Sequence, residues 1–172
     1  GSLDLTGSGD ALLVNGKALL NGALHIHNKT SDESGTYPSN MVEIFEIDDA
    51  EYVQPGDILV VSEGGKSILS RARTEYNRSV IGVISGNPAI IINADGTRQK
   101  AYPVALTGTV LCRIDARQKP LRPGDPVVTS ATPGCGMGGV IDSFDKIGTV
   151  LGKALDALAD GIALVPVFIS HS

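Results

Sequence analysis

The sequence contains no tryptophan, and aromatic residues make up only 4% of its 172 positions. Because 42% of the residues are nevertheless hydrophobic, we expect a core built from aliphatic side chains. Histidine occurs only three times. His171 is next to last, and the other two lie close together near the beginning, so neither a Ser-His-Asp hydrolase nor a second metal cluster is expected.

Positive charge and long apolar runs are also scarce. The chain has 14 Lys and Arg against 19 Asp and Glu, a net charge of −5 that gives no electrostatic support for nucleic-acid binding. No apolar run is long enough to cross a bilayer, and residues 1–20 lack a basic start followed by a hydrophobic block. We therefore expect no membrane insertion.

Cysteine occurs twice, at Cys112 in a candidate strand and at Cys135 in a glycine-rich loop. Two interpretations stay open: a disulfide between them, or one buried thiol and one loop thiol. Their spacing matches no metal-binding motif.

Glycine and proline, in contrast, are abundant, with 21 and 9 residues. This composition favours many short strands joined by turns, so we predict a mainly β fold with at most one or two short helices. Residues 153–161 permit either a helix ended by Gly161 or a strand that continues through Leu155.

A turn followed by a short apolar run occurs twice, at residues 55–62 and 123–130, each beginning with Pro-Gly-Asp. The proline fixes one backbone angle, the glycine supplies a positive φ, and the aspartate accepts nearby backbone N–H groups. The offset from Pro55 to Pro123 is 68 positions, and the offset between the Ile-Gly pairs that begin at 81 and 147 is 66. These offsets predict an internal duplication, with similar β units at about 41–93 and 103–169.

Residues 11–27 carry two Asn-Gly turns separated by short apolar pieces. Such short pieces cannot form a stable hairpin alone, so another surface must cover them. The segment resembles the β stems of trimeric phage fibres, which implies a homotrimer; a peripheral hairpin docked on the main domain is the alternative. We place a polar linker at 28–40, which gives a stem at 1–40 and a duplicated β domain at 41–172.

His25 and His27 end this stem and would share one face of a strand. On a three-fold axis, three such pairs would form an octahedral imidazole set suited to iron or another transition metal such as nickel. His-x-His pairs in trimeric phage tail spikes are similar. Two histidines in a solvated strand, without a metal, are the alternative.

Residues 41–169 contain seven segments that together match a known family in order and spacing; these are 42–46, 55–57, 81–86, 103–108, 121–125, 147–148 and 152–155. The resemblance is to a family of C-terminal domains on phage tail appendages and related bacterial surface proteins, named after the peptidase G2 intramolecular chaperone domain. It implies a mostly β, trimeric domain that guides assembly of a fibre stem, in a virion tail or at a cell surface.

The resemblance also implies that some members release themselves at a Ser-Asp bond, a step linked to ATP. Here Ser39 is followed by Asn40, an amide where the family has a carboxylate, which argues against cleavage. A self-cleaving site would use Ser39 as nucleophile and Glu43 or Glu46 as acid or base. The alternative is that these are ordinary loop and surface residues; around Glu43 and Glu46 a single helical turn is also compatible with the spacing. Binding of a host receptor or glycan at a fibre tip is a third function that fits the resemblance.

Overall fold

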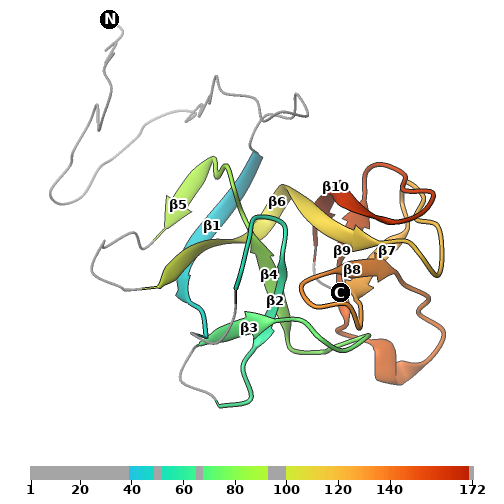
Figure 1. The fold of residues 1–172 in the computed structure, drawn as a ribbon, viewed down its shortest axis with the longest axis horizontal. Helices are drawn as coiled ribbons and strands as arrows, with labels where there is room; N and C mark the ends of the chain where they lie inside the picture. Colours follow the sequence, from blue (N-terminus) through green and yellow to red (C-terminus); the bar gives the residue numbers. More distant parts are fainter. Residues whose placement is uncertain (1–38, 49–51, 65–67, 93–99, 171–172) are drawn as a thin grey trace, which may run out of the picture.

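The computed structural model describes residues 39–48, 52–64, 68–92 and 100–170, and this part of the chain is almost entirely β (Figure 1). The elements are β1 (Ser39–Glu46), β2 (Ile58–Val61), β3 (Leu69–Arg71), β4 (Val80–Ile84), β5 (Ile90–Ile92), β6 (Ala101–Asp115), β7 (Pro126–Thr129), β8 (Gly136–Gly138), the 3-10 turn η1 (Phe144–Lys146), β9 (Val150–Ala154) and β10 (Ile162–Ile169). The predicted mainly β fold is confirmed. Within the described ranges, no helix has the length and apolar character needed to span a membrane.

The strands pair in the order β10-β9-β7-β8-β6-β4-β2-β3, and an additional pairing between β10 and β6 closes a small barrel. The remaining strands β1 and β5 extend the sheet, since β1 pairs with both β6 and β5. Figure 1 shows the long strand β6 running through the middle of the molecule. Its first half pairs with β1 and β4, and its second half pairs with β10 and β8.

The two Pro-Gly-Asp turns have the same geometry. In the first, the Asp57 carboxylate accepts a hydrogen bond from the Gln54 N–H, and in the second the Asp125 carboxylate accepts one from the Arg122 N–H. Both central glycines have a positive φ, near +90° at Gly56 and +87° at the second turn. Each turn therefore leads directly into a strand, as the sequence predicts.

Strand pairing after the turns is also repeated. Leu59 pairs with Gly82 across β2 and β4, with a register shift after Leu59. Val127 pairs with Gly152 across β7 and β9, with a register shift after Val127. The equivalent of Gly82 is thus Gly152, 70 positions on, and the predicted match at Ile147-Gly148 is wrong by four residues.

Of the two alternatives at residues 153–161, the structure has the strand: β9 runs to Ala154, and the Leu155 N–H donates to the Pro166 carbonyl. Another segment differs from the sequence-based expectation. Residues 133–139, expected to be a loop, contain β8, where Gly136 leaves no room for a side chain beside Ile58.

Two aliphatic clusters form the core, as the absence of tryptophan indicated. The larger combines residues from both repeated units, among them Ile58, Val83, Val127 and Leu151. From here on, the first unit means β2, β3, β4 and the first half of β6, and the second unit means β7, β8, β9 and β10. The smaller cluster lies around the first unit and includes Leu59, Ile84 and Val104, each at most 2% exposed. Cys112 and Cys135 are both buried and free, so the second thiol is not on an exposed loop.

Candidate functional site

The side chain of Asn40 is buried and hydrogen-bonded to two other segments of the chain. Its side chain is 4% exposed, its Nδ2 donates to the Thr109 carbonyl at 3.0 Å, and its Oδ1 accepts from the Ser85 hydroxyl at 3.0 Å. Its backbone carbonyl accepts from the Ala89 N–H. Asn40 therefore ties β1 to β6 and to the chain between β4 and β5. Ser39 begins β1 and its backbone pairs with Thr109.

Glu43 and Glu46 lie further along β1, in a strand and not in a helical turn. Glu43 is half-buried beside Val104 of β6, and Glu46 is exposed beside Ala101. At about 3.3 Å per strand residue, Glu46 lies roughly 20 Å from Asn40 and Glu43 roughly 10 Å from it. Within one chain, the structure therefore does not bring the four predicted cleavage residues into a single site.

The predicted metal ligands His25 and His27 lie outside the described residues. Among the residues that the structure describes, no group of three or more His, Cys, Asp or Glu side chains could hold a metal ion.

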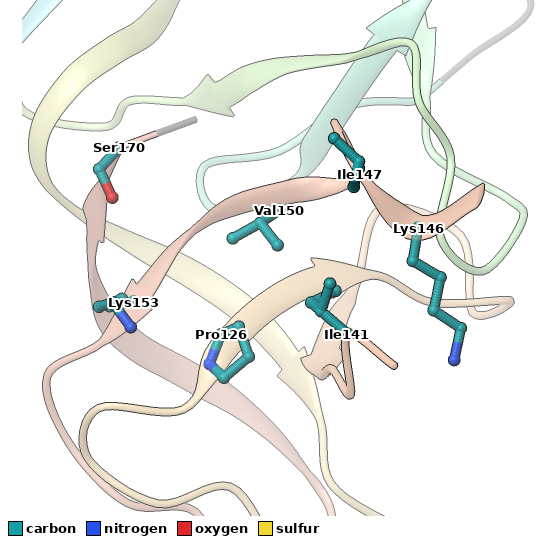
Figure 2. Close-up of a pocket in the computed structure, with 7 residues that line it drawn as sticks. All are labelled: Pro126, Ile141, Lys146, Ile147, Val150, Lys153 and Ser170. Atoms are coloured by element: carbon teal, nitrogen blue, oxygen red, sulfur yellow. The ribbon is translucent and has the colours of Figure 1, made fainter. Parts of the chain in front are cut away.

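A groove with a volume of about 330 Å³ lies on the outside of the second unit. Its lining residues come from β7, β9, the chain around η1 and the end of β10, and Figure 2 shows them as sticks: Pro126, Ile141, Lys146, Ile147, Val150, Lys153 and Ser170. Ile141 and Ile147 are 42% and 57% exposed. Apolar side chains thus make up most of the groove, with a lysine at each end (Figure 2).

Strand register explains why these side chains share a face. Lys153 pairs with Pro126 of β7 on one side and with Phe168 of β10 on the other, and paired residues in antiparallel strands point to the same side of the sheet. Along β10, Leu164 and Phe168 point outward and are about half exposed, whereas Val165 and Val167 are buried. The groove therefore continues into an apolar outer surface of β10.

The two lysines of the groove differ in their partners. The Lys146 ammonium donates to Asp142 at 2.9 Å and lies 4.5 Å from the centre of the Tyr76 ring. The hydrogen bond to Asp142 raises the pKa of Lys146 above its usual value. No hydrogen bond or ion pair joins the side chain of Lys153 to any other residue in the described ranges. Among the described residues, Lys153 is thus the groove lysine that has no ion-pair partner.

This groove has no signature in the linear sequence pattern. Its signal lies in the comparison of the two units, where Pro126 and Lys153 replace Ile58 and Val83. That comparison needs the correct offset of 70 for the second strand pair, which only the strand pairing reveals.

Comparison with known proteins shows similarity in fold but no match in sequence. No protein-family model matches the sequence, and no curated protein matches it. The C-terminal fragment of bacteriophage phi29 gene product 12 has a similar structure, with a TM-score of 0.56 and 14% sequence identity over 76% of this chain and 100% of the fragment.

The structure of the pre-mature phi29 gene product 12 is also similar, with a TM-score of 0.57 and 14% identity over 85% of this chain. The match spans 23% of that longer protein's length. Gene product 12 is a tail appendage protein. The described part of this chain therefore has a fold like that of the C-terminal domain of a phage tail appendage protein.

Proposed function

We propose that this chain is a structural domain of a phage tail fibre or tail appendage, and that it forms a homotrimer which assists the assembly of a fibre stem. The observation that carries the proposal is the likeness to the phi29 fragment, which extends over the whole of that fragment. Its place would be on a virion.

The N-terminal sequence supports the trimer. Residues 11–27 contain short apolar pieces between Asn-Gly turns, which need cover from another surface. Sister chains wrapped around one axis would provide that cover, and a domain that follows the stem would hold three chains in register.

The exposed apolar side chains of the groove fit a subunit contact. Ile141 and Ile147 both line it and are 42% and 57% exposed. Large exposed apolar groups of this kind mark interaction surfaces when they cluster, as the isoleucines of the groove do. An assembly role makes use of them without any catalytic group.

Light scattering coupled to size-exclusion chromatography tests the trimer directly. We expect the full 172-residue chain at micromolar concentration to give a mass three times that of one chain. A monomer under these conditions would contradict the proposal. Chemical crosslinking followed by denaturing electrophoresis provides a second readout, in which a three-chain band is expected.

A further inference from the structure

The first repeated unit has a sheet that is covered on both faces. On the face directed toward the second unit, Ile58, Val83 and Ala105 are all 0% exposed and belong to the larger core cluster. Ile58 packs so closely against Gly136 of β8 that a Cβ there would lie 2.7 Å from its Cδ1. The second unit is thus the cover for this face.

The second unit presents the equivalent face to the outside. The repeated register makes Pro126, Lys153 and Phe168 the counterparts of Ile58, Val83 and Ala105. Phe168 is 46% exposed, Lys153 is exposed and Pro126 is half-buried. The equivalent face of the repeated unit is therefore buried in the first unit and solvent-exposed in the second.

The opposite faces do not show this difference. Val127, Ala154 and Val167 of the second unit are at most 1% exposed, like their counterparts on the far face of the first unit. The second unit therefore has one face covered by the rest of the chain. The groove lies on its other face, which is the face that the second unit covers in the first unit.

We propose that a second copy of this chain covers the groove face of the second unit, so that this face is the contact between neighbouring subunits of the trimer. This inference rests on the proposed function. The proposed contact surface consists of Pro126, Lys153, Phe168 and the groove isoleucines Ile141 and Ile147. The neighbouring copy takes the position that the second unit itself takes on the first.

Charge supports a second copy as the occupant. Lys153, which has no ion-pair partner in the part of the chain that the structure describes, brings an ammonium group into an apolar surface. This suits a partner that offers a carboxylate within an apolar patch. The chain carries 19 acidic against 14 basic residues, a net charge of −5, so a second copy offers more carboxylates than cationic groups.

The positive charge of Lys153 also restricts the symmetry of the contact. In a two-fold contact centred on this groove, Lys153 of one copy would face Lys153 of the other, and like charges destabilise such an arrangement. A contact between the groove and a different surface of the next copy avoids this repulsion. Contacts of that type close into rings, of which a trimer is one.

Substitutions in the groove test the proposal in the full-length chain. Lys153→Glu reverses the charge and Ile147→Glu places a carboxylate in the apolar part of the groove. Both residues are exposed, so folding of the single chain does not depend on them, and thermal unfolding followed by circular dichroism verifies this. Val61→Glu is the matched control, because Val61 is 43% exposed on a strand but does not line the groove.

We expect each groove variant to raise the concentration at which half of the trimer has dissociated by at least tenfold, as light scattering across a dilution series would measure. The control should retain the wild-type value, and Lys153→Met should have a smaller effect than Lys153→Glu. If the wild-type chain is a trimer and both groove variants dissociate like wild type, this inference is wrong while the proposed function stands. A monomeric wild-type chain would overturn both. A loss of single-chain stability without any change in dissociation would also overturn the contact, because the groove would then be filled from within its own chain.

Discussion

The Asp57 carboxylate is completely buried and accepts a hydrogen bond from Nη1 of Arg113 at 2.9 Å. Burial raises the pKa of Asp57 above its usual value, although the hydrogen bonds from Gln54 and Arg113 act in the opposite direction. The carboxylate also lies against Gly134, where a Cβ would be 2.5 Å from its Oδ1. This ion pair joins the first turn, the central strand β6 and the segment that leads into β8.

Arg113→Met should therefore destabilise the fold by about 3 kcal/mol at neutral pH, because it leaves a buried carboxylate without its cation. The pKa of Asp57 in the folded state would rise further above its unfolded value. A group with a raised folded pKa contributes stability at low pH that is lost as the pH rises through that pKa, so the deficit should shrink in acid.

Urea unfolding at several pH values measures this effect. Arg122→Met is the control, because Arg122 is exposed and only its backbone N–H bonds to the second turn aspartate; a change within about 0.5 kcal/mol is expected. A deficit for Arg113→Met that is independent of pH would contradict the assignment.

Gly82 and Gly152 should not tolerate alanine. A Cβ at Gly82 would collide with the Ala105 carbonyl oxygen, and one at Gly152 would collide with the Phe168 carbonyl oxygen. Because backbone atoms cannot move aside without breaking strand pairing, each variant should lose about 2–3 kcal/mol of unfolding free energy. Gly64→Ala, where the nearest atom is Ser62 Oγ at 4.0 Å, should change little in the same unfolding assay.

Asn40→Ala should cost about 1–3 kcal/mol, because the Ser85 hydroxyl and the Thr109 carbonyl would lose their buried partner. Chemical denaturation of the purified variant measures the loss. Gln118→Ala, at an exposed position, is the comparison variant and should behave like wild type. Equal stability of the two variants would show that the Asn40 hydrogen bonds do not hold β1 in place.

The chain should remain intact during prolonged incubation with or without ATP. The Asn40 amide is occupied by two hydrogen bonds, and Glu43 and Glu46 are too far along β1 to act beside it in the same chain. Intact-mass spectrometry follows this over days. Release of an N-terminal fragment that Ser39→Ala abolishes would show instead that the chain cleaves itself.

If the chain forms the proposed trimer, iron or another transition metal should copurify with it at about one ion per three chains, with His25 and His27 as the expected ligands. Two imidazoles from each of three chains make a six-nitrogen set, which suits octahedral transition metals. Elemental analysis of protein purified without chelator measures the ratio, and His27→Ala should abolish it. A metal-free wild-type trimer would exclude the site.

The sequence predicted the parts of the fold that depend on local chemistry. The Pro-Gly-Asp turns were identifiable because proline, glycine and aspartate each impose a backbone preference, and the β-branched runs after them predicted strands. The repeat followed from those turns. Its second half was misaligned, because Ile147-Gly148 imitates Ile81-Gly82 in composition while the residue that must lack a side chain is Gly152.

The rest depended on packing between distant segments. The sequence around Cys135 and Gly136 indicates a loop. Both residues are nevertheless buried, and Ile58 and Val127 pack against Gly136. The place of Asn40 in a motif predicts a cleavage residue, whereas its hydrogen-bond partners Ser85 and Thr109 lie 45 and 69 positions away. The groove exists because the second unit covers the first and leaves its own equivalent face exposed. The order of residues in the sequence does not reveal this packing.

The fifteen-residue strand β6 has a consequence for how this molecule is made. Because both units share β6 and the larger core cluster joins them, the domain should fold in one cooperative step. Residues 108–115 of β6 find their β10 partners only after residues 162–169 have left the ribosome. Folding must therefore wait for the last strand, and a nascent chain stalled before it would expose the barrel interior to chaperones and proteases.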